Sequence, residues 1–363
     1  MLSQDKLYVN GRFLTQPLSG MQRYAEQLCG ALDAQFAADP ALAIRYRPEV
    51  LVPTGSRREH SWRVLRVREV GQLRSHVWEQ TELAFAARDG ILVNLIAAGP
   101  LLHSRSILAL HDAAVFAHPE HFSKSYRALH QVLRPRLARR AVRLVTISEF
   151  SRRELSKWLR IPEGAFTIIP DSAEHILHVE SDTRILSRYG LEPHRYALTV
   201  GNQTPNKNIA LALRAFVQAS PEGWQIAVAG GGASHIFAES ETADHPAVRK
   251  VGRVTDEELR ALYENAGMFL FPSRYEGFGV PPLEAMSLGC PVISSNASAM
   301  IEVLADAAYY FQSDDRGDLA HAIAKVAENA TLRADLAERG LARSRQYTWR
   351  SSAETLLDLI GAV

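Results

Sequence analysis

The sequence predicts an α/β protein made of two doubly wound domains with a cleft between them. Apolar, unalternating strand-like runs alternate with helical patterns along almost the whole chain, which is typical of parallel sheets covered on both faces. The alternation is interrupted over residues 170–194, where mixed charge without periodicity predicts a linker. The length of 363 residues also exceeds one average domain.

The first half opens with a strand-like run, KLYV, followed by Gly20 and a helical pattern. Apolar residues of this helix recur at i, i+3, i+4 and i+7 from Met21 to Leu32. Further buried strands are predicted in SILAL, RLVTI and FTIIP. The second half repeats the pattern with strands in RYALTV, WQIAVAG, MFLF, PVIS and AYYF. Its helices are predicted in IALALRAFVQA and in EELRALYENA, and a capping box from Thr255 to Glu258 begins the second of them.

Composition places the chain among ordinary soluble proteins, with 47% hydrophobic and 22% charged residues. Its two cysteines, Cys29 and Cys290, lie far apart without metal or redox spacing, so we expect free thiols and a reducing compartment. The first residues lack the apolar core of a secretory signal, and the most apolar run, ILVNLIAAGPLL, is too short to span a bilayer. We therefore expect a cytoplasmic protein without a transmembrane segment.

The net charge of +1 hides a marked asymmetry between the two halves. Residues 1–170 hold 24 Lys and Arg against 15 Asp and Glu, whereas residues 171–363 hold 17 against 25. This split predicts separate partners, with an anionic surface or ligand facing the first half. The densest basic run, at 134–143, is either a solvated helix face or a contact with the inner leaflet of the membrane. Nucleic acid is not expected as a partner.

One loop carries chemistry that an ordinary loop does not need. It follows the strand MFLF, at the edge where open α/β sheets bind ligands, and it reads EGFGVPPLE from Glu276 to Glu284. Glycines permit unusual backbone conformations and close approach of a ligand, and Pro281 and Pro282 fit the first turn of a helix. We place Glu284 in that first turn, with the free N–H groups of the helix directed at the loop.

A helix N-terminus beside a glycine loop favours an anion such as phosphate, whereas two carboxylates favour hydroxyl donors. A nucleotide diphosphate sugar satisfies both demands if a cation balances the phosphates. Lys207, in the loop VGNQTPNKN after another strand, is the candidate cation. Taken singly, Glu284 is more simply a favourable first-turn acid and Lys207 a surface lysine. Their shared position after strands of one domain favours a binding site.

The segment SRYEGFGVPPLEAMSLGCPVI closely resembles the E-x7-E signature of retaining glycosyltransferases of family 4, which have the GT-B fold. The resemblance covers nearly the whole chain. It includes GMQRYAEQL, LALHDAAVFAHPEHFS, TISEFSRREL and VGRVTDEELRALYENAGMFLFPS, which are individually less specific.

The resemblance implies a role for each matching residue. Glu276 would bind hydroxyls of the transferred sugar, Glu284 the ribose diol, and Lys207 the diphosphate. His111 would face the sugar and the acceptor, with His118 as the weaker alternative. The remaining donor contacts implied are Gly20, Met21, Asn202, Arg253, Val254, Phe278, Gly279 and Val280. Asn202 stands where many relatives carry an arginine, and the chain reads IIPDSAEH where Asn-Gly would be usual.

The same resemblance implies a domain plan. Residues 1–172 would bind the acceptor, 173–345 would bind the nucleotide sugar, and 346–363 would cross back as a helix. Tyr347 and Trp349 would brace the first domain.

The implied reaction is transfer of a hexose to a hydroxyl with retained anomeric configuration. A donor phosphate oxygen would take the acceptor's proton, and no cofactor or metal is expected. Resemblance to bacterial members favours GDP-mannose as the donor and a saccharide or lipid-linked saccharide of surface polysaccharide assembly as the acceptor. A nucleotide-sugar epimerase and a noncatalytic nucleotide-sugar-binding partner protein are the alternatives. A dehydrogenase is disfavoured, because His235 occupies the place of the third fingerprint glycine in AGGGASH.

Overall fold

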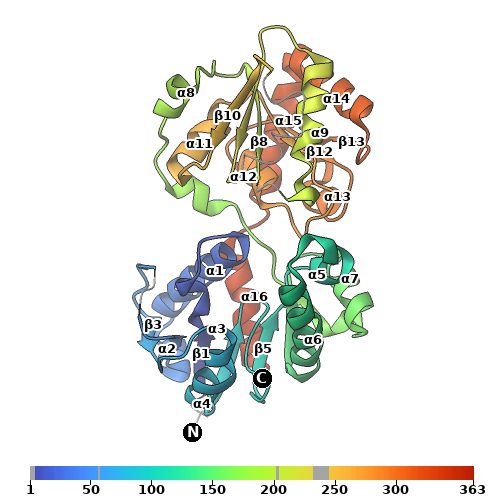
Figure 1. Ribbon diagram of the computed structural model, residues 1–363. Coiled ribbons are helices and arrows are strands. Elements are labelled where there is room, and N and C mark those ends of the chain that lie inside the picture. Colours follow the sequence, from blue (N-terminus) through green and yellow to red (C-terminus); the bar gives the residue numbers. More distant parts are fainter. Residues whose placement is uncertain (1–4, 56–57, 202–203, 232–244) are drawn as a thin grey trace. The chain divides into compact units, whose positions relative to one another are not determined.

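The computed structural model describes residues 5–55, 58–201, 204–231 and 245–363. It divides into two compact units (Figure 1). The first unit comprises residues 1–171 together with 349–363, and the second comprises residues 172–348. Each unit contains one parallel sheet flanked by helices, so the prediction of an α/β protein with two parallel sheets is confirmed.

The first unit holds a seven-stranded sheet in the order β3-β2-β1-β4-β5-β6-β7. All of its neighbouring strands pair in parallel. The strands are β1 (Lys6–Asn10), β2 (Glu49–Val52), β3 (Arg66–Glu69), β4 (Gly90–Asn94), β5 (Ser106–Ala109), β6 (Arg143–Thr146) and β7 (Phe166–Ile168).

The helices of this unit are α1 (Gly20–Ala38), α2 (Pro40–Tyr46), α3 (Ser75–Trp78), α4 (Ala84–Ala86), α5 (Ala114–Ala117), α6 (Lys124–Arg140), α7 (Glu149–Leu159) and α16 (Trp349–Gly361). Short helical turns are η1 (Gly11–Thr15), η2 (Glu79–Leu83), η3 (Pro119–His121) and η4 (Glu163–Ala165). The predicted apolar stripe of α1 is buried, and α16 packs along this helix (Figure 1). The ring of Trp349 lies 5.6 Å from that of Tyr24, centroid to centroid.

The second unit holds a six-stranded parallel sheet in the order β10-β9-β8-β11-β12-β13. Its strands are β8 (Tyr196–Val200), β9 (Gln225–Ala229), β10 (Val248–Gly252), β11 (Met268–Phe271), β12 (Val292–Ser295) and β13 (Ala308–Phe311). Its helices are α8 (Arg184–Tyr189), α9 (Ile209–Ala219), α11 (Asp256–Asn265), α12 (Val280–Ser287), α13 (Met300–Leu304), α14 (Arg316–Glu328) and α15 (Ala330–Ser344). The turns are η5 (Glu174–His178), η6 (Pro205–Lys207) and η7 (Ala305–Ala307).

The core of the second unit follows from the apolar strands and from the amphipathic α9. Side chains of α9, among them Phe216, pack with the sheet and with α14 in one buried cluster. The predicted capping box is present, because the Thr255 hydroxyl accepts from the N–H of Glu258, whose side chain accepts from the N–H of Thr255.

Two expectations about this unit are wrong. Residues 170–194 are not a plain linker, because they contain η5 and α8, and α8 ends at the left-handed Gly190 and packs on α11. Tyr347, expected to brace the first domain, contacts the second unit instead: its ring lies 5.2 Å from that of Phe278, and its hydroxyl accepts from Arg343 Nη2 at 2.7 Å. Among the described residues, no helix is both long enough and apolar enough to cross a membrane.

Candidate functional site

The second unit has a topological switch point between β8 and β11. From this central pair, the chain adds β9 and β10 on one side and β12 and β13 on the other. Open α/β sheets bind ligands where the strand order reverses, beyond the carboxyl ends of the strands. The loop that contains η6 leaves the end of β8, and residues 272–279 leave the end of β11. The two predicted motifs therefore lie at the same edge of one sheet.

The structure brings Lys207 and Glu276 together across these loops. Lys207 Nζ lies 2.6 Å from Glu276 Oε1, and the side chains are only 20% and 15% exposed. Two hydrogen bonds hold the loops in place: Arg274 N donates to Asn206 O at 2.7 Å, and Asn206 Nδ2 donates to Tyr275 O at 3.3 Å. The predicted cation and the first predicted acid thus form one half-buried ion pair.

The turn before α12 depends on the backbone of Gly279. This glycine caps the helix with φ at +101°, in the left-handed region that residues with a Cβ resist. The two prolines occupy the first turn as predicted, and Gly289 follows the helix with φ at +73°. Prolines have no N–H, however, so the first turn offers fewer donors than we expected. The backbone N–H groups that remain available in the segment predicted to contact the donor are those of Phe278, Gly279 and Val280.

Glu284 is not in the first turn of α12. The helix begins at Val280, so Glu284 is its fifth residue and lies one position further along than predicted. Its carboxylate is buried, with Oε1 2.8 Å from His175 Nε2, and Oε2 accepts from the Tyr263 hydroxyl at 3.0 Å. Sequence reasoning missed both partners.

Three glycines terminate neighbouring strands at this edge. A Cβ on Gly230 would lie 2.0 Å from Gly201 O, so no side chain fits where the ends of β8 and β9 approach each other. Gly252 ends β10 and is followed by exposed Arg253 and half-buried Val254. The Arg253 side chain lies over Gly231, since a Cβ there would meet Arg253 Nε at 2.7 Å. A Cβ on Gly252 would meet no atom within 4 Å, and Asn202 lies outside the described residues.

The predicted residues of the first unit are Gly20, Met21 and His111. Gly20 is the first residue of α1, and a Cβ there would meet no atom within 4 Å. His111 follows β5 and is buried; its Nε2 donates to Leu95 O at 2.8 Å, which leaves Nδ1 as the acceptor. Its ring contacts that of Tyr24, one turn after Gly20, at 4.6 Å. Burial lowers the pKa of His111, so the imidazole is neutral near pH 7.

One group of described residues has the side chains and spacing to hold a metal: His118, Glu120 and His121. Glu120 Oε1 lies 3.4 Å from His118 Nδ1 and 3.6 Å from His121 Nε2. Glu120 is 62% exposed, so these contacts are also those of an ordinary surface ion-pair cluster.

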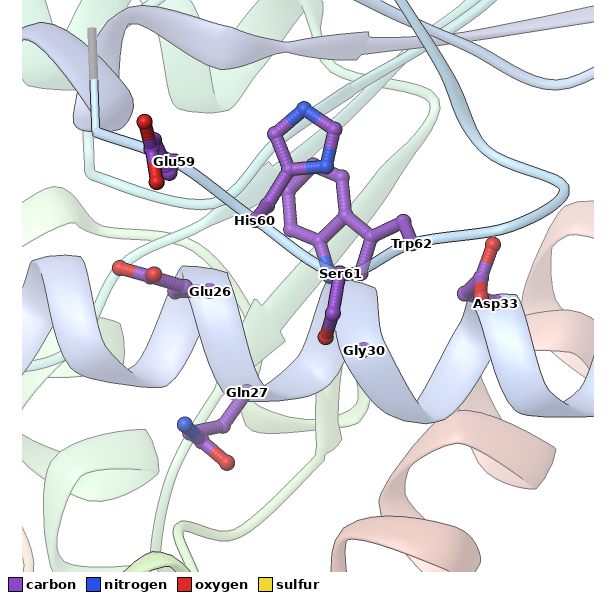
Figure 2. Close-up of a pocket in the computed structure, with 8 residues that line it drawn as sticks. All are labelled: Glu26, Gln27, Gly30, Asp33, Glu59, His60, Ser61 and Trp62. Carbon is purple, nitrogen blue, oxygen red and sulfur yellow. The ribbon is translucent and has the colours of Figure 1, made fainter.

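A separate hollow of about 560 Å³ lies in the first unit between α1 and residues 59–62. Figure 2 shows this segment running alongside the helix, with the rings of His60 and Trp62 next to each other. Two of its acids already have partners: Glu26 pairs with Arg58 at 2.8 Å, and Asp33 accepts from three backbone N–H groups of residues 63–65. None of the predicted site residues lines it, and its polar groups fix the loop.

Comparison with known proteins identifies the family of this chain. Residues 184–343 match the family model described as glycosyl transferases group 1. The O-antigen chain mannosyltransferase B of Escherichia coli is 30% identical over 269 residues, which cover 68% of each chain. The serotype-specific mannosyltransferase WbdA of Escherichia coli is 28% identical over 239 residues, covering 60% of this chain and 28% of WbdA.

Solved structures share the fold over the whole chain. WaaG, described as a glycosyltransferase involved in lipopolysaccharide biosynthesis, superposes with a TM-score of 0.71 at 16% identity, covering 98% of this chain and 99% of its own. Anabaena Alr3699/HepE in complex with UDP and glucose gives 0.74 at 16% identity, covering 99% and 100%. Fold and site together define an enzyme of the GT-B class. The chain belongs to the glycosyl transferases group 1 family, and it is a glycosyltransferase.

Proposed function

We propose that this glycosyltransferase moves a hexose from a nucleotide diphosphate sugar to a hydroxyl of a saccharide or lipid-linked saccharide, with retention of the anomeric configuration. The observation that carries the proposal is the Lys207–Glu276 pair at the switch point of the second unit. We favour mannose from GDP-mannose and surface polysaccharide as the pathway class, because the relatives that match this chain are named as O-antigen mannosyltransferases.

The main catalytic task assigned to this chain is stabilising the departing diphosphate. Lys207 supplies a positive charge that is already held by its loop, and preorganised charge is the most effective form of such stabilisation. Glu276, balanced by Lys207 in the free enzyme, is an acceptor for hydroxyls of the sugar. Glu284 is fixed by His175 and Tyr263 and accepts from the ribose diol. His111 presents its unprotonated Nδ1 towards the acceptor side, and the acceptor's proton leaves to a phosphate oxygen of the donor.

The test combines binding and product analysis. Melting temperatures are first recorded with a panel of nucleotide sugars, since a ligand that prefers the folded state raises the melting temperature. The donor so identified is then incubated with candidate acceptors in the presence of EDTA, and the anomeric configuration of the product is read by NMR. A product with inverted configuration contradicts retention. Sugar or epimer released without any acceptor supports an epimerase, and activity lost in EDTA contradicts metal independence.

Location at the inner leaflet of the cytoplasmic membrane is part of the proposal. Its support is α6, where Arg136, Arg139 and Arg140 are exposed beside Leu129 and Val132, which are 44% and 54% exposed. Anionic lipids attract such basic residues, and exposed apolar side chains add affinity for the interface. Co-sedimentation with vesicles of increasing anionic lipid content is expected to rise with lipid charge and to fall with salt. Binding insensitive to both contradicts the membrane location.

A further inference from the structure

The first unit has its own topological switch point, and a buried cationic cluster lies there. Its sheet places β1 next to β4, and the chain continues outward from this pair in both directions. We define the cluster as Arg12, His76, Glu79, His130 and Arg134. Arg12 follows the end of β1 by two residues, and Asn10 and Asn94 are the last residues of β1 and β4. Parallel sheets bind ligands at this kind of position.

One half of the cluster is internally balanced. Arg12 Nε lies 3.0 Å from Glu79 Oε1, and Asn10 Nδ2 donates to the same oxygen at 2.9 Å. The other oxygen of Glu79 lies 2.9 Å from His76 Nδ1. Glu79 is fully buried, so its negative charge is matched by the nearest guanidinium. The charges of this half are therefore balanced, although Arg12 Nε makes no hydrogen bond.

Arg134 forms the unbalanced half. It is 5% exposed, and its Nη2 donates to the Tyr126 hydroxyl at 3.3 Å, which is a neutral partner. Its Nε is buried without a hydrogen-bond partner, and no carboxylate of the described residues forms an ion pair with it. A buried charge without a counter-charge is expensive, and proteins normally pair it. The unsatisfied guanidinium therefore indicates a missing anion.

Neighbouring aromatic rings connect Arg134 to the balanced half of the cluster. The His130 ring lies 4.0 Å from that of Tyr126 and 5.4 Å from that of His76, and its Nδ1 is buried without a partner. Burial, together with the charges of Arg134, His76 and Arg12, lowers the pKa of His130 to about 4, so this ring is neutral near pH 7. The charge of Arg134 also contributes, after burial, to the lowered pKa of His111.

We propose that Arg134, with His130 on the neighbouring Tyr126 ring, binds a phosphate group of the acceptor. This inference rests on the proposed function, which makes the first unit the acceptor side. The guanidinium fork fits two phosphate oxygens at once, and a phosphate supplies the negative charge that Arg134 lacks. The shared chemistry is a phosphoryl group, and it belongs either to a soluble sugar phosphate or to the phosphate that links a glycan to a lipid.

The test compares mannose 1-phosphate with methyl α-mannoside by isothermal titration calorimetry without any nucleotide. The protein carries Lys207→Ala, which removes the phosphate-binding cation proposed for the second unit. Arg134→Met is compared with Arg136→Met, a control two residues away on the exposed face of α6. The control protein is expected to bind the phosphate at least about tenfold more tightly than the methyl glycoside, and Arg134→Met is expected to lose that preference.

Equal preference in the two variants overturns the proposal. The proposal is also overturned if the Arg136→Met control binds mannose 1-phosphate less than about twofold more tightly than methyl α-mannoside. This result can be obtained even if Arg134→Met fails to fold. A short prenyl phosphomannose is the third ligand. Tighter binding than mannose 1-phosphate supports the phosphate of a lipid carrier, and equal binding supports a soluble sugar phosphate. The calorimetry contains no donor, so it tests phosphate binding alone. The proposed function is tested separately by glycosyl transfer, and the two can therefore fail independently.

Discussion

Replacing Lys207 with alanine isolates the charge on which the proposed catalysis depends. Its ammonium lies 2.6 Å from a Glu276 oxygen and its side chain is 20% exposed, so it occupies a partly desolvated position at the ligand edge of the sheet. Two unit charges about 4 Å apart interact by about 4 kcal/mol at an effective dielectric constant of about 20. Since each 1.36 kcal/mol is tenfold in rate, Lys207→Ala is expected to lower kcat by about 100- to 1,000-fold.

The assay measures release of the nucleoside diphosphate together with formation of the glycosylated acceptor. Lys325→Ala is the matched control, because this lysine is exposed on α14 of the same unit and packs over the ring of Tyr309. Lys207→Ala leaves the partly buried Glu276 carboxylate without its cation, so urea denaturation should show a loss of about 1–3 kcal/mol, and activities are compared where both proteins are folded. A folded Lys207→Ala protein that keeps more than half of its activity would refute the assignment.

Three further predictions follow from buried or strained groups. Glu284→Ala leaves the Tyr263 hydroxyl and His175 Nε2 without their hydrogen-bond partner, so urea denaturation should show a loss of about 1–3 kcal/mol in the free energy of unfolding. Unchanged stability would contradict the observed bonds. Gly279→Ala must hold φ at +101°, which should cost about 1–2 kcal/mol, and a melting temperature equal to the parent's would show that the turn relaxes. The folded-state pKa of His130 is about 4, below its usual 6.5, so the unfolded state takes up a proton first as pH falls. Stability should therefore decline between about pH 6.5 and pH 4 more steeply in the parent than in His130→Gln, and parallel declines would contradict the lowered pKa.

The strands that sequence reasoning found have mainly apolar or aromatic runs, and they include the edge strands β7 and β13. The runs at β8, β9 and β11 are almost wholly apolar, and the structure buries nearly every residue in them. Four strands went unrecognised: the central strands β2 and β4, and two edge strands, β3 and β10. The sequences of β3 and β10, RVRE and VRKVG, carry the charges that edge strands use against aggregation, and this removes the apolar signal.

The site was predictable where a motif directly follows a strand. Lys207 and Glu276 each come a few residues after a predicted strand, and the rule for parallel sheets places them at one edge. The partners of Glu284 were not predictable in this way. His175 and Tyr263 come from the supposed linker and from the middle of α11, and only tertiary packing brings them to the carboxylate.

The basic run at 134–143 shows a similar limit. Its charge density predicts solvation or membrane contact throughout, yet Arg134 is buried. The helical spacing could have predicted this burial, because Arg134 lies on the same side of α6 as the buried residues Leu133, Leu137 and Ala138. Charge counting alone cannot find a buried arginine, whereas periodicity can flag one for inspection.

The first unit is formed from both ends of the chain, and this determines the order in which the two units can complete their folding during synthesis. The second unit is one continuous segment and emerges whole from the ribosome, but the first must wait for α16 before its fold is complete. Until then the partners of α16 on α1 are uncovered, and Pro170 O lacks the Ser352 hydroxyl that donates to it at 2.9 Å. A released chain that ends at residue 348 therefore has a complete second unit and an incomplete first unit, and the incomplete unit is the natural target for chaperones and proteases.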